Sequence, residues 1–150
     1  MSQPIRLSHS VSIMIYHFVC PAKYRRNVFE TNVDEELKKI CMEIENKYDM
    51  RFLEIGTDKN HVHFLIQSIP RLSAAQIIKT VKSITAKEIY KRCPEVKEKL
   101  WGGQFWSDGY YVSTVGQHGN EKVIQEYVKK QGIEKEYEQI LKQEQLDLFE

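Results

Sequence analysis

The chain has 150 residues, which is enough for one domain with a hydrophobic core of its own. Hydrophobic residues make up 41% and charged residues 29%, and no run approaches the roughly 18 uninterrupted apolar residues of a membrane span. The formal net charge of +1 does not by itself indicate a nucleic-acid-binding protein. Three widely spaced cysteines and an N-terminus without a signal-type apolar stretch predict a cytoplasmic protein.

The first half of the chain predicts a strand followed by a helix. Residues 9–20 are rich in β-branched and aromatic types and stop at Pro21, so they favour a strand. Apolar residues at helical spacing predict a helix over 33–48, with Thr31 or Asn32 as its N-terminal cap.

The next segments predict a hairpin, a second helix and a fourth strand. Residues 50–57 and 61–69 read as two short strands joined by a polar turn. Ser73 is a suitable cap for a helix over 74–92, and a strand follows near 106–115.

The C-terminal part predicts a third helix over 121–131, which Asn120 caps and Gly132 closes. We therefore expect a catalytic domain over residues 1–132 and a polar helical tail over 133–150. The order β-α-β-β-α-β is that of the ferredoxin-like α+β fold, a four-stranded antiparallel sheet with two helices on one face. The other face is left for a ligand, a partner or the third helix.

Two histidines begin the predicted third strand. His61 and His63 are two residues apart, so a strand points them to one face and Val62 to the other. Neutral imidazoles are good ligands for divalent metal ions, and Asp58 could complete the shell. A pair of half-exposed strand histidines explains the same spacing.

A tyrosine and a glutamine share one side of the predicted third helix. Gln131 follows Tyr127 by four residues, so the two side chains are neighbours on the helix. Tyr127 could attack a phosphate, with Gln131 as a further ligand, because a phenol aided by a metal can act as a nucleophile. An amphipathic helix that buries its tyrosine is the alternative.

Two groups of residues could contact nucleic acid. Basic side chains gather in one short segment and along the second helix: Lys23, Arg25 and Arg26, then Lys79, Lys82, Lys87, Lys91 and Arg92. An aromatic, glycine-rich stretch contains Trp101, Phe105, Trp106, Tyr110 and Tyr111. Aromatic side chains on a loop can stack on unpaired bases, or they can close the end of a core.

Four segments together carry a family resemblance. They are YHFVCPAKYRRNVF (16–29), GTDKNHVHFLIQSIP (56–70), LWGGQFWSDGYYVSTVG (100–116) and Tyr-x-x-x-Gln (127–131). In this order they resemble the single-tyrosine HUH transposases of the smallest bacterial insertion sequences, which move as single-stranded DNA. The resemblance covers about residues 8–132. It departs at Ala22, where the family often reads CPKYRR, and this touches no expected catalytic residue.

The resemblance implies an activity and its residues. His61 and His63 would be the HUH metal ligands, Gln131 the third ligand and Tyr127 the nucleophile. The enzyme would use Mg²⁺ or Mn²⁺, bind hairpins at insertion-sequence ends, and cleave and rejoin single-stranded DNA through a 5′-phosphotyrosine. The family assembles as a homodimer in which the tyrosine helix of one subunit completes the site of the other. The basic clusters become candidates for holding the hairpins through their phosphates.

Two other functions fit the same features. A domesticated HUH nickase acting on chromosomal repeats would keep the chemistry in another biological role. A non-catalytic single-strand nucleic-acid-binding domain can share the βαββαβ order. The strands here lack the aromatic-rich segment of such binding domains and carry His-Val-His instead.

Overall fold

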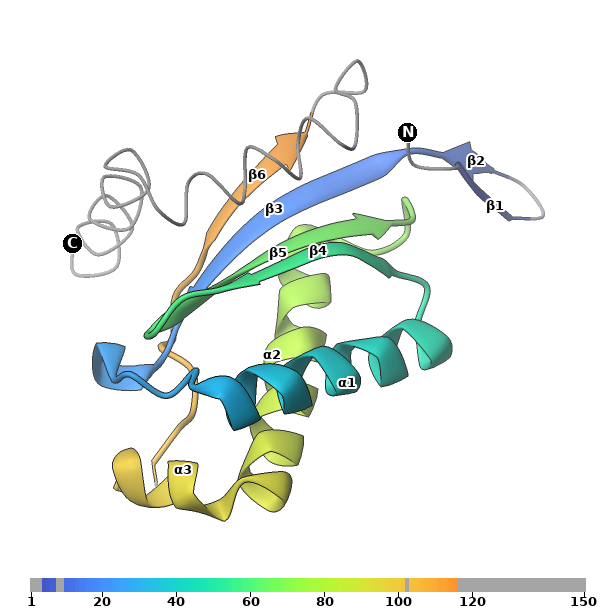
Figure 1. Ribbon diagram of the computed structural model, residues 1–150. Coiled ribbons are helices and arrows are strands. Elements are labelled where there is room, and N and C mark those ends of the chain that lie inside the picture. The colour runs from blue at the N-terminus through green and yellow to red at the C-terminus, as the bar shows by residue number, and fades with distance from the viewer. Residues whose placement is uncertain (1–3, 8–9, 102, 116–150) are drawn as a thin grey trace.

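The computed structural model describes residues 4–7, 10–101 and 103–115 (Figure 1). The strands are β1 (Ile5–Arg6), β2 (Val11–Ser12), β3 (Met14–Pro21), β4 (Arg51–Thr57), β5 (His61–Ser68) and β6 (Tyr111–Val115). The helices are the short 3-10 helix η1 (Lys23–Arg25), α1 (Thr31–Lys47), α2 (Ala74–Arg92) and α3 (Pro94–Lys99). The predicted third helix and the polar tail lie outside the described residues.

The four long strands form one antiparallel sheet in the order β4-β5-β3-β6, and helices α1 and α2 cover one of its faces (Figure 1). This confirms the predicted ferredoxin-like architecture. Strands β1 and β2 make a separate two-stranded hairpin, so the single strand expected over 9–20 is divided at Ile13. Among the described helices, none has the length and apolar character to cross a membrane.

The core lies between the sheet and the two helices. Strands β3 and β5 turn Phe18, Cys20, Val62, Phe64 and Ile66 toward it, and all five are fully buried. Helices α1 and α2 contribute Leu37, Ile40, Ile44, Ile77, Val81 and Ile89. The three cysteines, Cys20, Cys41 and Cys93, are free thiols, and all are buried in the way that small apolar residues are.

The start of α2 is the one predicted, whereas the start of α1 is not. Ser73 and Gln76 form a capping box, because the Ser73 hydroxyl accepts from the Gln76 amide at 3.1 Å and the Gln76 side chain accepts from the Ser73 amide at 2.8 Å. Helix α1 begins at Thr31, so the cap position is Glu30 and the expected cap at Thr31 or Asn32 is wrong. The Asn32 amide donates to Glu95 at 3.3 Å instead, across to the start of α3.

The strand expected near 106–115 is interrupted: Trp106 forms an isolated antiparallel bridge with Ala22, a loop follows, and β6 begins at Tyr111. The Lys82 ammonium donates to the carbonyls of Ser107 at 2.7 Å and Asp108 at 3.2 Å, and these bonds hold the loop against α2. Helix α3 was not predicted. Its first residue is Pro94, which suits a first helical turn because proline has no amide hydrogen to leave unpaired.

Candidate functional site

The His61–His63 pair lies on β5, an inner strand of the sheet. Val62 between them enters the core, so both imidazoles occupy the sheet face opposite α1 and α2. Their ring centroids are 5.8 Å apart, and the rings are inclined by 69°. The predicted side-by-side placement is therefore confirmed. Both side chains are buried, with 3% and 2% exposure, and are not half-exposed.

The turn before β5 orients His61. Asp58 closes the turn by accepting from the Lys59 amide at 2.7 Å, while its own amide donates to the His61 carbonyl at 2.9 Å. His61 Nδ1 lies 2.6 Å from the amide oxygen of Asn60. Because that oxygen can only accept, Nδ1 carries the proton and Nε2 keeps the lone pair that a metal ion needs. The Asp58 carboxylate lies 3.7 Å from the same Nε2.

His63 is oriented by a third histidine, His17 of β3. His63 Nδ1 lies 2.7 Å from His17 Nε2, and the two rings are nearly parallel with centroids 5.0 Å apart. His17 is buried and also contacts Tyr111 edge-on, with ring centroids 6.2 Å apart. From the sequence alone His17 had no visible partner. The β3–β5 register pairs Val19 with His63. His17 lies two residues before Val19 on the same face of β3, and this pairing therefore places it beside His63.

Burial keeps all three imidazoles neutral near pH 7. Loss of hydration lowers the pKa of His17 and of His61 to about 4, although Asp58 opposes the shift at His61 and the charge of Arg25 adds to it. Burial lowers the pKa of His63 to about 2, with smaller contributions from the two other histidines. A neutral imidazole is the form that binds a metal ion.

The chemistry of these donors fits a divalent ion. Two neutral imidazoles with a nearby carboxylate suit Mn²⁺, and Mg²⁺ when further oxygens are supplied. Within the described ranges, no three His, Cys, Asp or Glu side chains come together as a set that could hold a metal ion. Gln131, the predicted third ligand, and Tyr127, the predicted nucleophile, lie outside those ranges.

The first basic cluster is next to the histidine pair. Lys23, Arg25 and Arg26 follow directly on β3, whose last residue pairs with His61. The amide of Ala22 donates to the Asn60 carbonyl at 2.8 Å, which ties this segment to the turn before β5.

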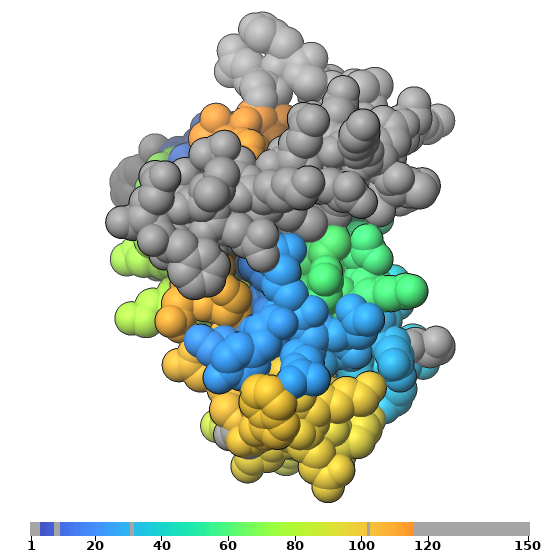
Figure 2. Space-filling view, turned by 90° about the vertical axis from the view of Figure 1, so that its left-hand side faces the viewer, coloured from blue at the N-terminus to red at the C-terminus, as the bar shows by residue number. Residues whose placement is uncertain are grey.

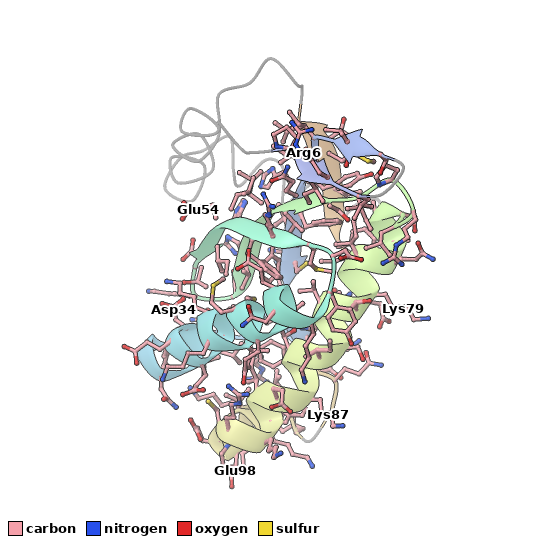
Figure 3. The ribbon with its side chains drawn as sticks, turned by 90° about the vertical axis from the view of Figure 1, so that its right-hand side faces the viewer. Arg6, Asp34, Glu54, Lys79, Lys87 and Glu98 are labelled. Atoms are coloured by element: carbon pink, nitrogen blue, oxygen red, sulfur yellow. The ribbon has the colours of Figure 1, made fainter. Side chains whose placement is uncertain are left out.

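The second basic cluster is remote from the histidines. It lies on α2, which covers the opposite face of the sheet. Lys79 and Lys87 project outward from that helix (Figure 3), whereas Lys82 is bonded to the loop before β6. The structure therefore separates the two basic clusters that the sequence suggested.

Most of the aromatic stretch belongs to the core. Phe105 and Trp106 are buried, and the Trp106 indole donates to the Thr85 hydroxyl at 2.9 Å. Trp101, in contrast to Trp106, is exposed.

Known proteins of similar sequence are transposases. Over 116 residues the chain is 30% identical to the ISDra2 transposase TnpA of Deinococcus radiodurans. These residues cover 77% of this chain and 82% of the relative. It is 33% identical over 129 residues to the transposase for insertion sequence element IS200 of Salmonella typhimurium, covering 83% and 81%.

Solved structures give the same relation. A candidate transposase from Deinococcus radiodurans R1 superposes with a TM-score of 0.68 at 26% identity, over 84% of this chain and 96% of the other. A REP-associated tyrosine transposase bound to a REP hairpin has a TM-score of 0.52 at 12% identity, over 85% and 68%, which shows a shared fold. The sequence model of IS200-like transposases matches residues 10–131. The chain belongs to the IS200-like transposase family.

Proposed function

We propose that this protein is a transposase that cleaves and rejoins single-stranded DNA at the ends of an insertion sequence. The observation that carries the proposal is the buried, neutral His61–His63 pair on an inner strand, in a chain of this family. Tyr127 is the proposed nucleophile, and the range that matches the family ends at Gln131, the proposed third ligand.

The proposed metal site uses one nitrogen of each histidine. His61 and His63 would bind Mn²⁺ or Mg²⁺ through Nε2, because their Nδ1 atoms contact Asn60 and His17. The metal ion would polarise the scissile phosphate and offset the charge that develops on it. The Asp58 carboxylate lies 3.7 Å from His61 Nε2 without forming one ligand set with both histidines in the described residues, so it would reach the ion through a water molecule.

The proposed reaction exchanges one phosphodiester bond for another. The Tyr127 hydroxyl loses its proton as its oxygen forms a bond to the scissile phosphorus, and the bond from phosphorus to the 3′ oxygen breaks. The leaving oxygen takes a proton and becomes a 3′-OH, while the 5′ phosphate stays on the tyrosine. Attack by another 3′-OH reverses the step and joins new ends, so no external energy source is needed.

Hairpin recognition is the second part of the proposal. A relative in fold is a transposase bound to a REP hairpin. In this chain Lys23, Arg25 and Arg26 would contact hairpin phosphates beside His61, because a cationic side chain gains affinity when it displaces the counterions of DNA. Lys79 and Lys87 lie on the other side of the domain, so they would meet DNA only if it wraps around the molecule.

Adduct formation tests the chemistry. Single-stranded oligonucleotides that cover the DNA on either side of the coding sequence are incubated with the protein and Mn²⁺. A 3′ label should travel with the protein on a denaturing gel, and a 5′ label should leave on a shorter fragment. The same chemistry on chromosomal repeats, without terminal hairpins beside the gene, would favour a domesticated nickase.

A matched pair of variants identifies the nucleophile. Tyr127→Phe should bind the oligonucleotide and form no adduct, whereas Tyr137→Phe makes the same change beyond the matched range and should form it normally. Persistence of the adduct in Tyr127→Phe would exclude Tyr127 as nucleophile. Absence of any adduct in the wild type, with binding intact, would favour the non-catalytic binding domain.

We further propose a homodimer with composite sites, in which Tyr127 acts on the histidines of the second subunit. Strands β4 and β6 are the edges of the described sheet, and an edge strand offers backbone groups to a second copy. Tyr127→Phe protein mixed with His61→Ala protein, under conditions of subunit exchange, should regain cleavage in a trans arrangement. A mixture that stays inactive after proven exchange would show that each subunit uses its own tyrosine.

A further inference from the structure

Two exposed aromatic side chains meet beside the first basic cluster. Tyr24 of η1 is 61% exposed and Trp101, which follows α3, is 71% exposed, the highest values among the large hydrophobic residues of the described chain. Their ring centroids are 5.5 Å apart and the rings are tilted by 51°. Figure 2 shows the two segments side by side on one face, blue above yellow. Scattered exposed aromatics are ordinary, but two in contact form a small surface.

The backbone under this Tyr24–Trp101 pair is strained. In the part of the chain that the structure describes, the non-glycine residues with positive φ are Tyr24 at 60°, Arg25 at 51° and Trp101 at 53°. All three belong to the two segments that form the pair. Such conformations are costly for residues with a side chain, and they concentrate at functional sites.

Hydrogen bonds hold the strained segments in place. The Lys23 amide donates to the Phe105 carbonyl at 2.9 Å, and the Arg25 amide donates to the Ala22 carbonyl at 3.0 Å. The Trp101 amide donates to the Glu98 carbonyl at 3.1 Å. The backbone that carries the two rings is therefore held by hydrogen bonds in both segments.

One cationic side chain lies against each of the two rings. Arg26 Cζ lies 4.3 Å from the centroid of the Trp101 ring, and Lys23 Nζ lies 5.6 Å from the centroid of the Tyr24 ring. Lys23 also makes a long ion pair with Asp108 at 3.9 Å. A surface of this kind complements a nucleotide, because a base can stack on an aromatic ring while the cations pair with the adjoining phosphates.

We propose that the Tyr24–Trp101 pair is a stacking site for an unpaired base of the single-stranded DNA substrate. This inference rests on the proposed function. It also specifies the path of the DNA strand next to the His61–His63 pair. Pro21, three residues before Tyr24, pairs with His61 in the β3–β5 register. A base stacked on the pair would therefore hold the adjoining backbone near the His61–His63 pair. Stacking accepts any base, so the site contributes affinity and position without reading sequence.

Binding measurements without cleavage test this inference. Tyr127→Phe protein is titrated against fluorescein-labelled oligothymidylate of 12 nucleotides, against the same backbone without bases, and against a 12-base-pair duplex. Introducing Trp101→Ala into the Tyr127→Phe protein should weaken its binding of the oligothymidylate about 5- to 100-fold. It should leave the affinity for the abasic strand unchanged. Trp101→Phe should retain most of the affinity because it keeps a ring.

Two controls separate stacking from charge and from loss of structure. Tyr48→Ala removes another exposed aromatic, 46% exposed at the end of α1, and should leave binding unchanged. Arg26→Ala should lower the salt dependence by about one counterion, whereas Trp101→Ala should not change it. Urea unfolding midpoints verify that each variant is folded.

The outcomes are distinct. Equal weakening of the abasic strand and the oligothymidylate by Trp101→Ala, or no weakening of either, would overturn the stacking site. A wild type that never forms an adduct, but shows the base-dependent loss with Trp101→Ala, would overturn the proposed enzyme and leave the stacking site standing.

Discussion

Replacing His17 with phenylalanine should weaken metal binding, although His17 is not itself a proposed ligand. In the contact of 2.7 Å between His63 Nδ1 and His17 Nε2, two neutral rings share one proton. A metal ion on His63 Nε2 requires that this proton belong to His63 Nδ1 and that His17 accept it. Phenylalanine keeps a ring beside His63 and removes the acceptor, so the favoured proton position is lost.

The expected loss follows from what such partners contribute elsewhere. Removing the group that orients a ligating histidine typically lowers metal affinity about 10- to 100-fold, which is about 1.4 to 2.7 kcal/mol. His17→Gln offers an amide oxygen as acceptor and should recover much of that loss. Because His17 is buried, phenylalanine also overfills its site, and we expect about 1 to 3 kcal/mol of lost stability.

Two measurements distinguish orientation from general damage. Titration with Mn²⁺, followed by electron paramagnetic resonance of the free ion, gives the affinity of each variant. Nitrogen-15 spectra of the imidazoles, recorded without metal, report which nitrogen of His63 is protonated. Wild-type Mn²⁺ affinity in His17→Phe, or a His63 that is unprotonated at Nδ1 in the wild type, would refute the argument.

Four further predictions concern stability and the metal. The three site histidines have lowered pKa values in the folded state, so below pH 6.5 the unfolded chain binds more protons and stability falls toward pH 4, by up to about 1.4 kcal/mol per pH unit for each; urea titrations across this range should show it. Thr85→Val leaves the buried Trp106 indole without its acceptor and should cost about 1 to 3 kcal/mol in the same assay. Ser73→Ala removes the capping box and should cost about 1 kcal/mol, whereas Ser83→Ala, on the exposed side of α2, should cost less. EDTA should abolish adduct formation, and added Mn²⁺ or Mg²⁺ should restore it; an unchanged yield in EDTA would exclude the metal.

Elements with strong local signals could be predicted closely from the sequence. Helix α2 begins and ends where its cap and Pro94 predict, because capping and the missing proline amide act within one turn. Strand β5 begins at His61 as expected, since a polar turn precedes it and every second residue is apolar. The opposed faces of Val62 and the two histidines follow from that alternation alone.

Features that depend on distant partners could not be predicted. The chain between the Trp106 bridge and β6 is a loop, and its bonds to Lys82 of α2 join residues 25 and 26 positions apart, which no local pattern specifies. His17 joins the site only through the pairing of β3 with β5, and no local pattern specifies that register. Asn32 bonds to Glu95, 63 residues away in the chain, instead of capping its own helix.

The alternation of histidine and apolar residues along β5 also makes the stability of the fold depend on the placement of the two histidines. A slip of one residue in this strand would turn His61 and His63 toward α1 and α2 and would expel Val62 and Phe64 from the core. Two imidazoles would then replace two apolar side chains in the interior, at a cost of several kcal/mol. A one-residue insertion or deletion before the strand that shifted its register would therefore destabilise the whole domain, in addition to misplacing the two histidines, so folding and site geometry depend on the same alternation.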